Sequence, residues 1–132
     1  MDEPKSESDV QQHIQAEGPK YGCQLLRNNS GAFENAQGQW IRFGLGNVSK
    51  KHSDKIKSSD LIGFTKVTIT PDMVGKVVAV FTAVEVKKPG WKLLGKTPEE
   101  KAQLAFIDWV FLQGGLAGFA NSVESFRKIL GV

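Results

Sequence analysis

The chain has 132 residues, of which 40% are hydrophobic and 23% charged, a composition that fits a globular protein and excludes disordered and collagen-like classes. Seventeen Lys and Arg against 14 Asp and Glu give a net charge of +3, too mild an excess to identify a polyanionic partner by itself. The length predicts a single domain over residues 1–132, with residues 1–5 as a flexible tail.

The sequence lacks the features of a membrane or secreted protein. No stretch approaches the roughly 18 consecutive apolar residues that a membrane helix needs. The first residues are polar and acidic with no apolar core behind them, so we expect no secretory signal. Cys23 is the single cysteine, which excludes an internal disulfide and a cysteine-rich zinc site. We therefore expect a reduced, cytoplasmic protein with no membrane partner.

The first half of the chain predicts a helix, a strand and a long loop. Ser6 is a favourable helix N-cap, Asp9 follows it at the third position of a capping box, and Gly18-Pro19 ends the helix after Glu17. Residues 24–28 read as a short strand. Residues 29–57 are rich in Gly, Asn, Ser and Gln and read as a loop, in which Trp40 and Phe43 serve either as core side chains or as base-stacking groups.

The middle of the chain predicts the strands of a sheet. Residues 60–64 read as a strand entry, and residues 66–70 alternate like a half-buried strand. Pro71, Asp72 and Gly75 form a turn. Residues 77–86 are nearly all apolar and β-prone, which predicts the longest buried strand, at the centre of the sheet.

The last third predicts helix, strand and helix. Thr97 as N-cap, Pro98 at the first helical position and two acidic residues after it start a helix that continues to about Gln113. Its inner face is predicted to carry Leu104, Ile107 and Phe111. A strand near residues 116–121 and a helix over 122–130 complete an α/β fold, with a small mixed β-sheet flanked by helices.

An acid inside the apolar strand 77–86 is the most informative feature. Glu85 is costly there as an isolated charge, so it needs an ion pair or a cation. Lys87 follows two residues later, and because strand side chains alternate, the two lie on the same face. A structural ion pair at the strand end and a catalytic pair explain this spacing equally well.

Further candidates lie elsewhere in the chain. Asp60 precedes an apolar strand entry and either hydrogen-bonds nearby amides or, together with Glu85, makes a hard-oxygen site suited to Mg²⁺ or Mn²⁺. Glu7 lies in a first helical turn, where such a residue usually serves the helix dipole. Gln103 lies on the helix after the lysine-rich segment and either points toward the strand end or lies on the surface.

Other catalytic classes have little support in the sequence. It contains no P-loop, no G-x-G-x-x-G and no G-x-S-x-G motif. His13 and His52 are isolated, which argues against a zinc site and against a histidine-based nucleophile relay.

Four pieces, in order, resemble the virus-type replication–repair nuclease (VRR-NUC) family, a branch of the PD-(D/E)XK nuclease superfamily. They are Glu7-Ser8-Asp9-Val10-Gln11, Ser59-Asp60-Leu61-Ile62-Gly63, Val84-Glu85-Val86-Lys87, and the helix with Gln103. The similarity runs from about Glu7 to Phe126, and the short length resembles the stand-alone viral and bacterial members. Where family members often have Gly-x-Pro before the Asp, this chain has Lys57-Ser58-Ser59.

The resemblance implies a PD-(D/E)XK core that hydrolyses DNA phosphodiester bonds with Mg²⁺ or Mn²⁺. It implies that Asp60, Glu85 and the carbonyl of Val86 bind the ion, and that Glu7 is an accessory acidic ligand. Lys87 would assist the nucleophilic water, and Gln103 would contact the phosphate or support the metal ligands.

For the small form the resemblance also implies a homodimer that acts on branched DNA, similar to a Holliday junction resolvase, in the host cytoplasm if the protein is viral. Two alternatives stay open: a nuclease for flap, nicked or linear duplex DNA, and a DNA-binding module without catalysis. Either way, basic residues are candidates for phosphate contacts, namely Lys50, Lys51, Lys55, Lys57 and Lys88.

Overall fold

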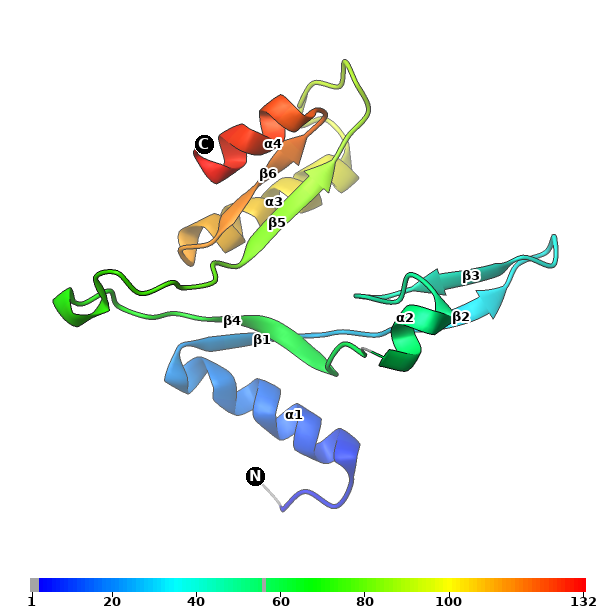
Figure 1. Ribbon diagram of the computed structural model, residues 1–132, viewed down its shortest axis with the longest axis horizontal. Helices are drawn as coiled ribbons and strands as arrows, with labels where there is room; N and C mark the ends of the chain where they lie inside the picture. The colour runs from blue at the N-terminus through cyan, green and yellow to red at the C-terminus, as the bar shows by residue number, and fades with distance from the viewer. Residues whose placement is uncertain (1–2, 56) are drawn as a thin grey trace. The chain divides into compact units, whose positions relative to one another are not determined.

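A computed structural model describes residues 3–55 and 57–132 of the chain. Residues 1 and 2 of the expected N-terminal tail lie outside the described part. Lys5, the last residue of that tail, bonds to the first helix: its backbone N–H donates to Asp9 Oδ2 over 3.1 Å. The structure forms two compact units, residues 1–67 and residues 68–132. The expected mixture of helices and strands is confirmed in both (Figure 1).

The first unit begins with α1 (Glu7–Glu17) and η1 (Gly18–Tyr21), which lead into β1 (Cys23–Arg27). The Ser6 side chain accepts from the Asp9 N–H, so the predicted N-cap is confirmed. Only the Ser6 half of the predicted capping box forms, because the Asp9 carboxylate accepts from the Lys5 N–H in place of the Ser6 N–H. β1 pairs antiparallel with β4 (Leu61–Thr65), which confirms the strand predicted after Asp60.

The region predicted as a loop contains regular structure. β2 (Gly31–Glu34) and β3 (Trp40–Phe43) form an antiparallel hairpin, and α2 (Lys50–Lys55) follows it. The prediction of a loop over residues 29–57, functional or partly ordered, therefore missed two strands and a helix. The hairpin strands are only four residues long, and polar residues around the apolar ones hide the alternation that indicates a strand.

The strand predicted over residues 66–70 is absent in the described chain. The Lys66 N–H donates to the carbonyl of Gly22, but residues before Cys23 belong to η1 and its turn, so β1 offers no ladder partner beyond this point. η2 (Pro71–Met73) follows in the second unit. The alternation of side chains over residues 66–70 was not sufficient to predict a strand, because a strand also requires a neighbouring strand that extends as far.

The long strand predicted over residues 77–86 is limited to β5 (Thr82–Val86). β5 pairs in parallel with β6 (Leu116–Ala120), and the register aligns Thr82 with Leu116. β6 cannot extend further back because Gly114 and Gly115 end the preceding helix. The Leu116 N–H donates to the carbonyl of Phe81 over 2.9 Å, and residues 77–80 therefore lie outside this ladder. β5 belongs to a two-stranded sheet in the described residues, and the expected central position in one larger sheet stays a prediction.

A helix connects the two parallel strands. α3 (Pro98–Leu112) starts at the predicted cap, where Thr97 accepts from the Glu100 N–H, and α4 (Val123–Leu130) starts at a Ser122–Ser125 capping box. β5 and β6 lie side by side, and α3 and α4 pack against them (Figure 1). Ile107, Val110 and Ala120 form the buried core of this unit.

The inner face of α3 differs from the prediction at one position. Ile107 is 8% exposed and Leu104 is half-buried, but Phe111 is 66% exposed and Val110 takes the inner position with no exposure. Residues 103, 107 and 110 repeat at the i, i+4, i+7 spacing of a helix face. The side of α3 that faces the sheet is therefore rotated by about one residue from the predicted one.

Candidate active site

The carboxyl end of β5 carries Glu85 and Lys87. Glu85 lies opposite Phe119 of β6, and the backbone N–H of Lys87, just after the strand, donates to the carbonyl of Ala120 over 2.8 Å. The ladder thus fixes both residues at the same end of the strand pair. Lys87 Nζ lies 4.0 Å from Glu85 Oε1, so the two side chains form the ion pair that alternation along a strand permits.

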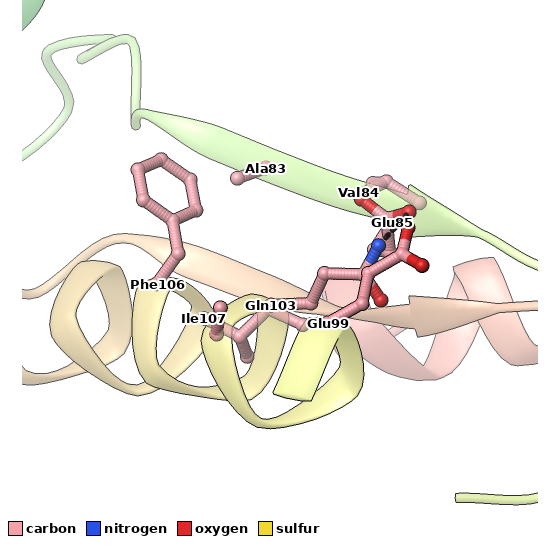
Figure 2. A pocket seen from close by; sticks show the side chains of 8 residues that line it. Ala83, Val84, Glu85, Glu99, Gln103, Phe106 and Ile107 are labelled. Carbon is pink, nitrogen blue, oxygen red and sulfur yellow. Dashed lines mark hydrogen bonds between the residues drawn. The ribbon is translucent and has the colours of Figure 1, made fainter. Parts of the chain in front are cut away.

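Gln103 on α3 bridges this pair. Its Nε2 donates to Glu85 Oε1 over 3.0 Å, and its Oε1 accepts from Lys87 Nζ over 2.7 Å. One amide thereby holds a carboxylate and an ammonium group in a fixed relation, using both ends of the same planar group. Figure 2 shows Gln103 reaching from the helix toward Glu85 on the strand. The helical position of Gln103 and the strand position of Glu85 are 18 residues apart in sequence and meet only through packing.

Two aromatic rings enclose Lys87 on its other side. Nζ lies 5.3 Å from the ring centroid of Trp91 and 5.7 Å from that of Phe119, within the range of cation–π attraction. The two rings lie 4.8 Å apart. The Lys87 side chain is 17% exposed, whereas the Glu85 side chain is 40% exposed. The ammonium group is therefore largely withdrawn from water and is held by one amide oxygen, one carboxylate and two rings.

Trp91 is itself held in place by α3 and β6. Its Nε1 donates to Glu100 Oε1 over 3.3 Å, and its carbonyl accepts from Asn121 Nδ2 over 3.4 Å. Glu100 Oε2 is buried and has no hydrogen-bond partner among the described residues, and burying such a polar atom costs free energy. Sequence reasoning missed Trp91 and Phe119. The one local signal for a contact with Lys87 was the position of Trp91, four residues later in the sequence. Phe119 approaches Lys87 only because of the β5–β6 register, which the sequence does not show.

A cavity of about 350 Å³ lies beside this cluster, between β5 and α3 (Figure 2). Its apolar lining comes from Ala83, Val84, Ala102, Phe106 and Ile107, and its polar lining from Glu85, Glu99 and Gln103. Three side chains with carboxylate or amide groups therefore meet a mostly apolar hollow. Such a setting strengthens the electrostatic interactions of groups that line it.

The first unit carries the other two acidic candidates. Asp60 directly precedes β4, and its carbonyl accepts from the Asn28 N–H over 2.9 Å. Asn28 Nδ2 also donates to the carbonyl of Ser59 over 2.7 Å, so the backbone around Asp60 is fixed although Gly-x-Pro is absent. The Asp60 residue is exposed, so the carboxylate lies at the surface of this unit.

Glu7 lies in the first turn of α1 and is exposed. Gln15 of the same helix donates to the carbonyl of Leu25 over 3.3 Å, so α1 lies along β1. Glu7 precedes Gln15 by eight helical residues, or about 12 Å along α1. Asn28, which bonds Asp60, follows Leu25 by three extended residues, or about 10 Å along the direction of β1. α1 and β1 run in opposite directions (Figure 1). The first turn of α1, which carries Glu7, and the end of β1, which pairs with the start of β4 next to Asp60, therefore lie toward the same end of the first unit.

The structure thus brings together Glu85, Lys87 and Gln103 in one unit and places Glu7 and Asp60 in the other. Among residues 3–55 and 57–132, no group of three or more His, Cys, Asp or Glu side chains is close enough to hold a metal ion. The contacts of Glu85 named above all use Oε1, so its second oxygen and the Val86 carbonyl next to it are hard donors suited to Mg²⁺ or Mn²⁺. These two donors alone make an incomplete site.

The basic candidates lie in both units. Lys50, Lys51 and Lys55 belong to α2, Lys57 follows it, and Lys88 follows β5. All five residues are exposed. Within the described ranges, no helix combines the length and the apolar character that a membrane span requires.

Models of known protein families, curated proteins and solved structures give no match to this chain. An acid, an amide and a largely buried ammonium group at the carboxyl end of a strand provide a cation ligand, an orienting group and a positive charge within one small volume.

Proposed function

We propose that this protein is a metal-dependent endonuclease that hydrolyses phosphodiester bonds of DNA, with the PD-(D/E)XK core of the VRR-NUC family. The observation that carries this proposal is the hydrogen-bonded set of Glu85, Gln103 and Lys87 at the end of β5. A purely structural ion pair does not need an amide that spans both charged groups, nor an adjoining cavity. A site that must hold a carboxylate and an ammonium group around a substrate needs both the amide and the cavity.

Each residue has a defined role in this proposal. Glu85, Asp60 and the Val86 carbonyl hold Mg²⁺ or Mn²⁺, and Glu7 is an accessory acidic ligand. When bound, the ion polarises a phosphoryl oxygen and lowers the pKa of a water molecule. Lys87 orients the attacking water and offsets negative charge as it develops on the phosphate. Gln103 fixes the position of Lys87 relative to Glu85.

The substrate and the assembly follow from charge and apolar surface. Lys50, Lys51, Lys55, Lys57 and Lys88 contact DNA phosphates in this proposal. The protein acts as a homodimer on branched DNA, because two nearly symmetric cuts need two sites related by a two-fold axis. Phe111 and Leu112 leave 66% and 79% of their surface exposed on α3, which supports an apolar contact between copies.

The decisive experiment measures divalent-ion-dependent cleavage of a labelled four-way junction. Glu85→Gln and Lys87→Ala should each lower the cleavage rate at least about 100-fold while junction binding persists. Matched controls are Glu124→Gln and Lys128→Ala, which remove the same charges from an exposed ion pair on α4 and should leave cleavage unchanged. Variants of Glu85 and Lys87 that cut as fast as the parent would contradict the assignment.

The same assay separates the alternatives. Flap, nicked and linear duplex substrates of equal length show whether branched DNA is preferred. Binding of every substrate without cleavage in Mg²⁺ or Mn²⁺ would indicate a DNA-binding module without catalysis. Sedimentation velocity tests the dimer, and the mass of one chain at assay concentrations would contradict it.

A further inference from the structure

The hairpin β2–β3 lies in the first unit and contributes no residue to the proposed site at β5. Its turn is built around Asn35, whose Oδ1 accepts from the backbone N–H groups of Gln37 and Gln39. Gly38 has φ 76°, a conformation that glycine adopts at no steric cost. Four residue pairs follow in register, from Glu34–Trp40 to Gly31–Phe43. The hairpin is thus a defined element and not a flexible connection.

The side chains of this hairpin are unusually exposed for their size and apolar character. Phe33 and Phe43 lie on one face with ring centroids 6.3 Å apart and are 51% and 46% exposed. Trp40 is 69% exposed. An indole ring left in water forgoes one of the largest gains of free energy that burial of a side chain provides. Such a ring at the surface of an element with no other apparent purpose indicates a ligand with its own flat apolar face.

A groove runs along β3, the strand that carries Trp40. It has a volume of about 770 Å³ and is lined by Trp40, Ile41, Arg42, Phe43, Gly44, Asn47, Val48, Ser49 and Lys50. Its far wall is the segment 44–50, which Asn47 fixes to the hairpin: Nδ2 donates to the carbonyls of Gly31 and Phe43 over 2.7 and 3.0 Å. The groove is therefore formed by hydrogen-bonded backbone on both sides.

The charges of the groove favour an anionic occupant. Arg42 and Lys50 line it, and no acidic residue does. The Asn47 side chain accepts from Arg42 Nη1 over 3.1 Å, which holds the guanidinium group at the wall. Lys51 and Lys55 follow one helical turn apart on α2, so basic side chains continue beyond the groove. Glu34 is paired with Trp40 across the hairpin but is not part of the lining.

We infer that this groove binds single-stranded DNA, with an unpaired base stacked on Trp40 and the phosphates along Arg42, Lys50 and α2. Aromatic stacking combined with a basic groove is how proteins bind single strands without reading sequence. Bases of intact duplex are stacked on one another and cannot reach a side chain without being flipped out. The inference rests on the proposed nuclease function only in naming DNA: it identifies unpaired nucleotides, such as those at an open branch point, as the part of the substrate that the first unit recognises.

The test uses the Glu85→Gln full-length protein in EDTA, so that binding is measured without cleavage. The probes are a fluorescein-labelled oligothymidine of 20 nucleotides and a duplex of equal length, followed by anisotropy. Trp40→Ala should weaken oligothymidine binding about tenfold or more and duplex binding less than about twofold. Trp40→Phe should restore most of the affinity, because a phenyl ring also stacks. Tyr21→Ala removes an aromatic side chain that is 77% exposed in η1 and is the matched control.

Two further measurements keep the inference falsifiable if Trp40→Ala fails to fold. Oligothymidine should quench the tryptophan emission of the parent, and Trp40→Phe should lose this quenching. Lys50→Ala together with Lys51→Ala should reduce the slope of log affinity against log salt by about 1.4, near 0.7 for each lost phosphate contact on a single strand.

The outcomes separate this inference from the proposed function. Single-strand binding that depends on Trp40 in a protein that never cleaves DNA would support the groove and contradict the nuclease. Unchanged oligothymidine binding in Trp40→Ala, an equal loss for duplex, or quenching that persists in Trp40→Phe would each overturn the groove assignment. Binding of an acidic protein segment in place of DNA would overturn it as well.

Discussion

Lys87 is held in position by contacts from three separate segments of the second unit. Gln103 reaches it from α3, Phe119 from β6 and Trp91 from the loop after β5. Cation–π attraction to two rings fixes the direction of the long lysine chain. In the proposed function, Trp91 and Phe119 are therefore positioning residues for Lys87, and they would act only through it.

Loss of the Trp91 ring should reduce turnover more than substrate binding. We expect Trp91→Leu to lower kcat at least about tenfold with KM within about twofold, because a misplaced catalytic group weakens the transition state and not the bound substrate. Trp91→Phe should recover part of kcat. Acetylation of Lys87 by acetic anhydride, followed by mass spectrometry, should be faster in Trp91→Leu because the ammonium group loses its cover.

A control distinguishes positioning from general loss of structure. Trp109→Leu removes an indole ring that packs 5.7 Å from Phe106 in the same unit. Equal losses of kcat in the two variants would indicate unfolding. Unchanged kcat and unchanged Lys87 acetylation in Trp91→Leu would remove Trp91 from the site.

At the scale of elements, close backbone approach fixes β4 against β1. Gly63 of β4 pairs with Leu25, and a methyl group at Gly63 would overlap the carbonyl oxygen of Gln24. Asp60 lies at the start of the same strand, so its backbone position depends on this pairing. The segment Ser59–Gly63 thus has a structural requirement at Gly63, in addition to the chemical role that is proposed for Asp60.

Gly63→Ala should cost at least about 3 kcal/mol of the free energy of unfolding, because backbone atoms must move to admit the methyl group. Gly118→Ala is the matched control in β6. There the added methyl group would meet Ile129 side-chain atoms, which can rotate away, so we expect a cost near 1 kcal/mol. Urea denaturation followed by circular dichroism measures both. Equal costs would show that the β1–β4 contact is looser than described.

At the scale of the whole molecule, the proposed metal site requires acids from both units. Glu85 and Gln103 lie in residues 68–132, whereas Asp60 and Glu7 lie in residues 1–67. The proposed site forms only where Asp60 shares a cation with Glu85. This requirement is testable without any cleavage assay.

We expect Asp60→Asn to weaken Mn²⁺ binding at least about tenfold in calorimetric titration, because a neutral amide is a poor ligand for a hard cation. Glu85→Gln should have an effect of similar size. Asp54→Asn removes an exposed acid of the same unit and is the control for a general change of charge. Mn²⁺ affinity that is unaltered in Asp60→Asn, or lowered equally in Asp54→Asn, would contradict a shared site.

The sequence by itself determined the elements whose signals are local. The caps at Ser6 and Thr97 mark the starts of α1 and α3, and the same-face relation of Glu85 and Lys87 follows from strand geometry alone. These features depend on hydrogen bonds and periodicity within a few residues, so neighbouring sequence is sufficient to specify them.

Only the tertiary structure decided where strands end and which side chains meet. β5 stops short of residues 77–80 because β6 begins at Leu116, whose N–H already donates to the carbonyl of Phe81. Val110 replaces Phe111 because the packing of α3 sets its rotation. Trp91, Phe119 and Gln103 meet Lys87 through the β5–β6 register and the packing of α3 on the sheet. Such contacts join residues far apart in sequence, and their geometry is fixed by ladder partners and packing, which no local pattern encodes.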